Sequence, residues 1–176
     1  MSGHNKWSKI KHKKAATDAK KSKIFGKLVR LIQTESRQAF GDTSAPNLRA
    51  AIEKAKKENM PADNIDRAVK KGVGGEGGEM ESLTYEAYGP GGVAIIIVAL
   101  TDNRNKAAAE LKHILSKHSA SLAAPGAASW AFTNKDGAWI PNQTTTLSDE
   151  DIEKLERLVD DIEENDEVQS VSTNAE

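Results

Sequence analysis

The sequence predicts an α+β protein, with an all-helical N-terminal region followed by a region that pairs strands with helices. Residues 1–72 contain three stretches of helical periodicity, and residues 84–176 alternate strand and helix patterns. The charge reverses between the two regions. Residues 1–72 hold 18 Lys and Arg against 7 Asp and Glu, whereas residues 73–176 hold 7 against 19. This contrast predicts two domains with different tasks.

Helical periodicity in the first region predicts a small bundle of three helices, within a domain that spans residues 1–72. The first helix runs through about residue 39 and takes its apolar face from Ile24, Leu28, Leu31, Ile32 and Phe40. A second begins near Pro46, and a third extends from Pro61 to Gly72. Gly72 directly follows two lysines, which predicts a left-handed cap at the end of the third helix.

Glycine is concentrated after this bundle, where five of the eight residues from 72 to 79 are glycine. We therefore predict a flexible linker at residues 73–83 and a second domain at residues 84–176. The second domain opens with strand patterns at residues 84–88 and 93–100, on either side of a glycine turn. That turn lacks the lysine and Ser/Thr of a phosphate-binding loop, so a structural turn is favoured.

The rest of the second domain reads as helix, two strands, helix and strand. Asp102 or Asn103 caps a helix to about residue 117, and a glycine- and alanine-rich loop follows. Strands at residues 129–132 and 138–140 flank a hairpin turn at Asp136-Gly137. Ser148 opens the last helix, and residues 168–171 close the domain as a strand. After the initial strand the order is βαββαβ, which is the ferredoxin-like plan of an antiparallel sheet with two helices on one face.

Composition and motifs argue against several functional classes. The chain has no cysteine, so it has no disulfide and no thiolate site. Its longest apolar run has eight residues, against the ~18 to 20 needed to cross a bilayer, so we expect a soluble, cytoplasmic protein without a membrane partner. Its four histidines lack zinc-protease spacing, and no nucleophile motif is present. We predict no catalytic residue, metal or cofactor, with a metal-dependent nuclease as the remaining enzymatic alternative.

A nucleic acid is the expected partner, because the first 30 residues carry ten lysines and arginines against one acid. Lysine is a point charge, so we expect contacts with phosphates and shape rather than with base edges. The indole of Trp7 either stacks on an unpaired base or packs on the helices. A solvated basic face is the alternative for the lysines. The predicted nucleic-acid-binding residues are Lys6, Trp7, Lys9, Lys11, His12, Lys13, Lys14, Lys20, Lys21, Lys23, Lys27 and Arg30.

Several motifs, taken in order, resemble the YebC/PmpR family, to which the mitochondrial translational activator of cytochrome oxidase also belongs. They are Gly3-His4-Asn5-Lys6-Trp7, Ile10-Lys11-His12-Lys13-Lys14-Ala15-Ala16, Asn59-Met60-Pro61, Tyr88-Gly89-Pro90-Gly91-Gly92-Val93-Ala94 and Leu100-Thr101-Asp102-Asn103-Arg104-Asn105. The resemblance implies a helical N-terminal domain, mixed α/β domains and a role in gene expression. It also marks the loop at residues 101–105, where Arg104 is a candidate secondary contact and its neighbours cap and fix the loop.

The resemblance leaves two functions open. Some members are described as DNA-binding transcriptional regulators, and others as translation factors that bind ribosomal RNA and relieve stalling. Because the lysine-rich region suits structured RNA, we favour a ribosome-associated translation factor, with a DNA-binding transcriptional regulator as the alternative. Members usually carry a further domain inserted between residues 132 and 140, where this chain has only a short turn. We therefore expect a compact variant that lacks this inserted domain.

Overall fold

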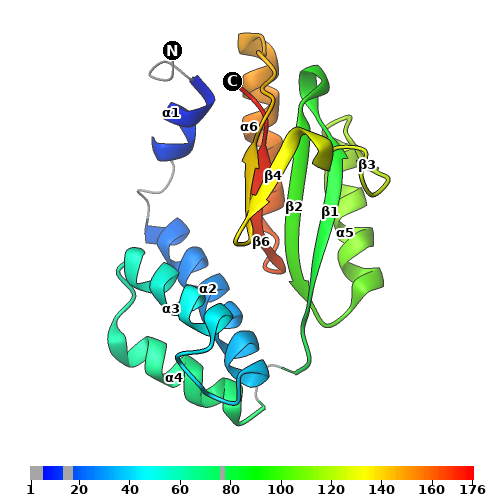
Figure 1. Cartoon of the computed structure of the whole chain (residues 1–176). Helices are drawn as coiled ribbons and strands as arrows, with labels where there is room; N and C mark the ends of the chain where they lie inside the picture. The colour runs from blue at the N-terminus through cyan, green and yellow to red at the C-terminus, as the bar shows by residue number, and fades with distance from the viewer. Residues whose placement is uncertain (1–5, 14–17, 76–77) are drawn as a thin grey trace. The chain divides into compact units, whose positions relative to one another are not determined.

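The computed structural model describes residues 6–13, 18–75 and 78–176 and divides them into two compact units (Figure 1). The helical unit comprises residues 18–81. The α/β unit comprises helix α1 (Lys6–Lys13) and residues 82–176. The α+β class predicted from the sequence is confirmed. The structure groups the chain differently at its start, because α1 belongs with the α/β unit rather than with the helices that follow it.

Three helices form the helical unit: α2 (Asp18–Gln38), α3 (Pro46–Lys57) and α4 (Ala62–Val73). Their positions agree with the three predicted helices, since the apolar stripe of each faces a shared core. That core contains Leu28 and Ile32 of α2, Leu48 of α3 and Ile65 of α4. Phe40 departs from the expectation that it extends the first apolar face. Helix α2 ends at Gln38, and Phe40 turns to a positive φ of 52° with 91% of its surface exposed.

Gly72 is not the predicted left-handed cap, because α4 continues through it to Val73. The residue is buried where α4 crosses α2, and a Cβ atom added to it would lie 2.4 Å from the backbone oxygen of Gln33. Nearby, the Ser36 hydroxyl donates a hydrogen bond of 2.7 Å to the carbonyl oxygen of Val69. Gly72 therefore lets two helix backbones approach closely, a role that a local sequence pattern does not distinguish from capping.

The α/β unit is built on a four-stranded sheet in the order β3-β1-β2-β6. Its strands are β1 (Glu81–Tyr88), β2 (Ala94–Thr101), β3 (Ser121–Ala123) and β6 (Val168–Thr173). Strand β3 pairs antiparallel with β1, and β6 pairs antiparallel with β2. Helices α5 (Arg104–Lys117) and α6 (Asp149–Glu164) supply residues to the same core cluster as Ile95 and Ile97 of β2. The predicted arrangement of two helices against an antiparallel sheet is thus observed.

The strands that fill the sheet differ from the predicted ones. Strands β4 (Phe132–Lys135) and β5 (Ala138–Pro141) were expected inside it, but they pair with each other as a separate two-stranded sheet. The sheet instead includes β3, which lies where we predicted a glycine- and alanine-rich loop. A strand of only three residues, Ser-Leu-Ala, carries too little alternation to be recognised in a sequence.

The β4–β5 hairpin covers the face of the sheet opposite the helices. Phe132 and the half-buried Trp139 pack there against Ala94 and Ile96 of β2, with the short 3-10 helix η3 (Ser129–Ala131) beside them. The two-residue turn at Asp136 and Gly137 has positive φ at both positions, as the Asp-Gly pair predicted. β2 is therefore enclosed between two layers.

Predicted helix caps are also observed in the α/β unit. The Asn103 side chain accepts a hydrogen bond from the backbone N–H of Lys106 at the start of α5, and Ser148 accepts one from Asp151 at the start of α6. The turn at residues 89–92 contains the 3-10 helix η2 (Pro90–Gly92) and contacts α6, so it has the structural role expected of it.

Glu86 of β1 holds the loop that leads to the hairpin. Its carboxylate accepts three backbone hydrogen bonds, from the N–H groups of Gly126, Ala128 and Ser129 at 2.6, 3.0 and 2.6 Å. Burial raises the pKa of Glu86, but the three N–H donors together lower it by more than burial raises it. The pKa of Glu86 therefore lies below its usual range. An internal carboxylate therefore fixes the path of residues 126–129.

We predict opposite effects of alanine at two glycines of the helical unit. Gly72→Ala should lower the free energy of unfolding by about 2–3 kcal/mol, because the added Cβ meets backbone atoms that cannot rotate away. Gly26 is an exposed residue of α2, and a Cβ atom added to it would meet no other atom, so Gly26→Ala should raise the free energy of unfolding by about 0.5–1 kcal/mol. Urea unfolding followed by circular dichroism measures both. Equal effects at the two positions would contradict the close approach at Gly72.

Glu86→Gln should lower the free energy of unfolding by about 1–3 kcal/mol at pH 7, because an amide cannot accept all three N–H groups. The folded pKa of Glu86 is depressed, so its contribution is complete above the unfolded pKa and is lost as the pH falls through the folded pKa. The difference between wild type and variant should therefore shrink below about pH 4. Urea unfolding between pH 3 and pH 7 tests this, with the exposed Glu153→Gln as control. A difference that stays constant with pH would contradict it.

Candidate nucleic-acid interface

The predicted cationic residues divide between the two units. Lys6 and Lys9 are exposed on α1, in the α/β unit. The structure does not describe the side chains of Lys11, His12 and Lys13, and Lys14 lies outside the described residues. The other predicted cations lie on α2, in the helical unit: Lys20, Lys21, Lys23, Lys27 and Arg30.

Trp7 packs in the interior. Only 7% of its surface is exposed, and it belongs to the core cluster that includes Val93 and Leu155, with the half-buried Ile10 packed against the same cluster. The sequence left two roles open for Trp7, stacking on a base or packing against the protein. The structure supports packing, because a buried ring has no face available for a base. Trp7 is therefore corrected from a candidate contact to the anchor of α1.

Lys6 already has an acidic neighbour in the α/β unit. Its Nζ lies 2.7 Å from Oδ1 of Asp149, the first residue of α6, and this hydrogen bond and the charge of Lys6 lower the pKa of Asp149. Both side chains are largely exposed, so water screens the attraction between them. The pair therefore contributes little to the stability of the α/β unit.

Helix α2 concentrates its cations on one stripe. Lys20, Lys23, Lys27, Arg30 and Arg37 follow each other three, four or seven residues apart, which places them on one side of an α-helix. We call these five residues the α2 stripe. It spans about 25 Å of helix axis, and the two acids of α2, Asp18 and Glu35, lie off it. Leu28 and Ile32 lie on the opposite face of α2 and pack in the core. The stripe therefore points away from the core of the helical unit. Lys21 lies about 100° round the helix from Lys20, outside the stripe.

The C-terminal end of the α2 stripe meets the segment that follows α4. Arg37 forms an exposed ion pair of 3.6 Å with Glu79, and Arg30 donates a hydrogen bond of 3.7 Å to the sulfur of Met80. Arg37 was not among the predicted site residues. Its spacing of seven residues from Arg30 is the sequence signal that extends the stripe to it.

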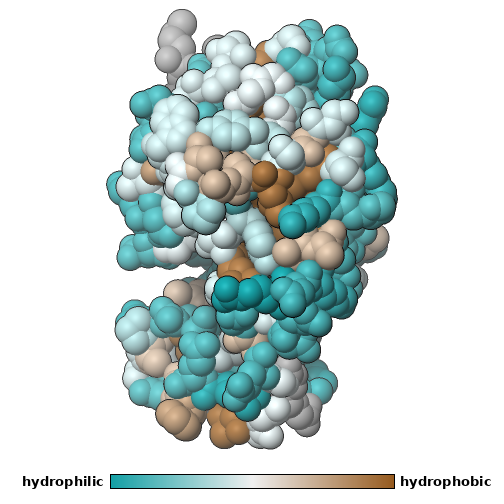
Figure 2. Space-filling view, turned by 90° about the vertical axis from the view of Figure 1, so that its right-hand side faces the viewer, coloured by the Kyte–Doolittle hydropathy of each residue, from teal (hydrophilic) through white to brown (hydrophobic). Residues whose placement is uncertain are grey.

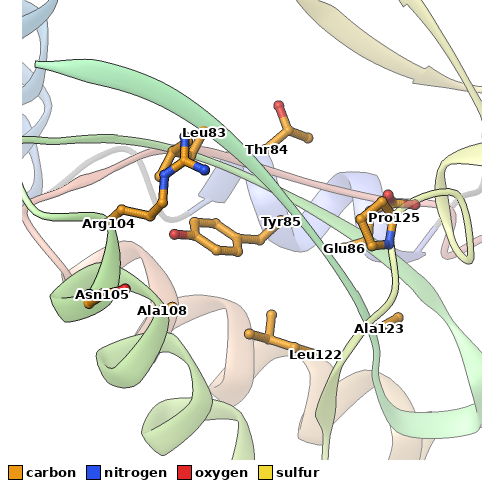
Figure 3. Close-up of a pocket in the computed structure, with 10 residues that line it drawn as sticks. All are labelled: Leu83, Thr84, Tyr85, Glu86, Arg104, Asn105, Ala108, Leu122, Ala123 and Pro125. Atoms are coloured by element: carbon orange, nitrogen blue, oxygen red, sulfur yellow. The ribbon is translucent and has the colours of Figure 1, made fainter.

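The loop at residues 101–105 is fixed internally, as predicted for it. The Thr101 hydroxyl accepts the N–H of Asn103 at 2.9 Å and donates to the carbonyl oxygen of the same residue at 3.1 Å. Asn103 in turn caps α5. Arg104 is exposed and lines a cleft beside β1 (Figure 3). It belongs to the α/β unit, whereas the α2 stripe belongs to the helical unit.

None of the described helices is long and apolar enough to cross a membrane. Among the residues that the structure describes, no three histidine or acidic side chains are grouped so as to hold a metal ion.

Comparison with known proteins identifies the family. Residues 5–75 match the TACO1/YebC protein N-terminal domain, and residues 80–137 and 133–175 match the TACO1/YebC second and third domain. The chain therefore belongs to the TACO1/YebC family. The crystal structure of a conserved hypothetical protein from Aquifex aeolicus superposes with a TM-score of 0.80 at 33% identity, covering 97% of this chain and 96% of that one.

Two bacterial relatives illustrate the similarity over nearly the whole chain. A protein of Fervidobacterium nodosum is 50% identical over 173 residues, covering 96% of this chain and 68% of its own length. A protein of Desulfatibacillum aliphaticivorans is 50% identical over 176 residues, covering 98% and 71%. Both are named probable transcriptional regulatory proteins. The present chain is therefore shorter than both relatives, and spans about 70% of their length.

Trp7→Ala should destabilise the α/β unit by up to about 3–5 kcal/mol, because it removes a large side chain from the core. Trp7→Phe, which keeps most of the apolar surface, should cost much less. Urea unfolding measures stability, and titration with duplex DNA of the folded variants measures affinity. An alanine variant of unchanged stability that binds nucleic acid weakly would return Trp7 to a stacking role.

Proposed function

We propose that this protein is a non-enzymatic, nucleic-acid-binding regulator of gene expression. The observation that carries the proposal is the α2 stripe, where five cations occupy one side of a helix and no acid of that helix interrupts them. Lysines and arginines in such a row neutralise successive phosphates and release their counterions. The exposed Lys6 and Lys9 of α1 offer a second group of phosphate contacts.

Transcription is the first setting to test, because relatives that are half identical to this chain are named probable transcriptional regulatory proteins. Those names support a role without catalysis, and they make DNA the first candidate ligand. In this proposal the protein works in the cytoplasm, on chromosomal DNA.

Translation on the ribosome is the second candidate. The observation in its favour is the composition of the α2 stripe, in which three of five cations are lysines. Lysine contacts phosphates as a point charge and does not supply the bidentate geometry with which arginine reads guanine. A surface of this kind suits the shape and backbone of structured RNA, including ribosomal RNA.

Neutralising the α2 stripe should weaken binding in a salt-dependent way. We expect the triple variant Lys20→Gln, Lys23→Gln and Lys27→Gln to flatten the slope of log affinity against log salt by roughly 0.7–0.9 per lost phosphate contact. The loss should be similar for unrelated sequences. Fluorescence anisotropy with a duplex DNA and a hairpin RNA, across a range of NaCl concentrations, measures both.

The matched control changes the same number of charges elsewhere, with glutamine at Lys112, Lys117 and Lys135, three exposed residues of the α/β unit. If the two triple variants lose the same affinity, the loss depends only on the net charge of the protein. That result would reject the stripe as the binding surface. A third variant with alanine at Lys9, Lys11, Lys13 and Lys14 measures the contribution of the N-terminal segment separately. In cells, crosslinking separates the two settings, since reads confined to promoter DNA exclude the ribosome and reads confined to ribosomal RNA exclude transcription.

A further inference from the structure

One edge of the main sheet is only partly covered. Strand β3 pairs with residues 86–88 of β1 and ends at Ala123. Within the part of the chain that the structure describes, no strand continues this ladder beside residues 82–85 of β1. Ser82 and Thr84 are exposed there. A strand edge of this kind presents backbone N–H and C=O groups at every second residue, ready to pair with another extended chain.

A cleft of about 290 Å³ opens beside the same edge (Figure 3). Its apolar walls are Leu83 and Tyr85 of β1, Ala108 of α5, Leu122 of β3, and Pro125. The Tyr85 ring projects from β1 toward α5 across the cleft. Figure 2 looks at this side of the protein and shows apolar surface hollowed between hydrophilic side chains. The volume lies just below the range typical of small-molecule pockets, and it suits one or two apolar side chains.

The rim of the cleft favours a negative charge. Arg104, the first residue of α5, is exposed and reaches from the helix toward β1 (Figure 3). The first turn of α5 contains no acid that would offset the positive end of its dipole. Glu86 also lines the cleft, but its carboxylate is engaged by the three N–H groups of residues 126–129.

We propose that this edge binds an extended peptide segment of a partner protein by strand addition to β1. The peptide backbone pairs with residues 82–85, one apolar side chain enters the cleft, and a carboxylate on the peptide meets Arg104. Backbone pairing supplies affinity in this mode, and a pocket for alternate side chains supplies specificity. The site lies in the α/β unit, and none of the residues that line its cleft belongs to the α2 stripe.

Charge distinguishes this occupant from two others. In a two-fold pairing of β1 with β1 of a second copy, the helices lie on the same face of the joined sheet, so two α5 N-termini and two Arg104 side chains converge. A peptide with a carboxylate brings opposite charge to the same place. A nucleic acid requires several cations, whereas Arg104 is the only one among the residues that line the cleft.

Fluorescein-labelled eight-residue peptides test the proposal. Each peptide has β-branched residues at alternate positions, one leucine and one aspartate at a varied distance from it, and a matched set replaces aspartate by asparagine. We expect the intact 19.0 kDa chain to bind a subset of the aspartate peptides, with NMR amide shifts centred on residues 82–85.

Two variants and one control identify the site. Ala108→Phe fills the cleft and Arg104→Glu reverses its charge, and each should weaken the aspartate peptides at least about tenfold. Arg104→Glu should have little effect on the asparagine peptides. Lys112→Glu makes the same charge change at an exposed residue of α5 that does not line the cleft, and it should leave binding unchanged. Circular dichroism shows that each variant is folded.

Several results would overturn the proposal. One is the absence of binding to every peptide at concentrations on the order of 1 mM. Another is binding that survives both Ala108→Phe and Arg104→Glu. Self-association that Ala108→Phe abolishes would assign the edge to a second copy, and displacement of bound peptide by duplex DNA or hairpin RNA would assign it to nucleic acid.

Discussion

The α/β unit is organised by the burial of β2 on both faces. Seven of the eight residues of this strand are buried, and successive side chains point to opposite sides of the sheet. Ile95 and Ile97 therefore need one apolar layer, and Ala94 and Ile96 need another. Helices α5 and α6 supply the first layer and the β4–β5 hairpin supplies the second. If one face of β2 were polar, helices α5 and α6 alone would cover the apolar face. Because both faces are apolar, the hairpin is needed as a second part of the core.

Much of this architecture could be predicted because the signals are local. The apolar spacing in α2, α3, α4 and α6, the cap at Ser148 and the Asp-Gly turn each depend on residues close together in the chain. The features that were missed depend on distant partners. The carboxylate of Glu86 is held by N–H groups that lie 40, 42 and 43 residues away in the chain. Position 72 needs a glycine because the backbone of Gln33 leaves no room for a Cβ atom. Strand β3 pairs with β1, which lies much earlier in the chain.

The candidate site shows the same division. The cations of α2 could be placed on one stripe because a helix repeats every 3.6 residues. Whether Trp7 stacks or packs could not be decided from its neighbours, since a tryptophan among lysines suits either role. The structure places it in the core, and α1 thereby carries its lysines on the α/β unit, whose overall charge is otherwise acidic. Basic residues that are neighbours in sequence thus belong to two separate units.

The turn at Asp136 and Gly137 is a position where the chain can change without disturbing the core of the α/β unit. Its two residues close a hairpin whose arms are held by their own pairing and by contacts of Phe132 and Trp139 with β2. The turn itself is exposed and contributes no side chain to the core clusters. A whole domain can be gained or lost at such a point without moving a buried residue, provided that the ends of the insertion lie as close together as neighbouring strands. An insertion at this exposed turn would leave the pairing of β4 with β5 in place.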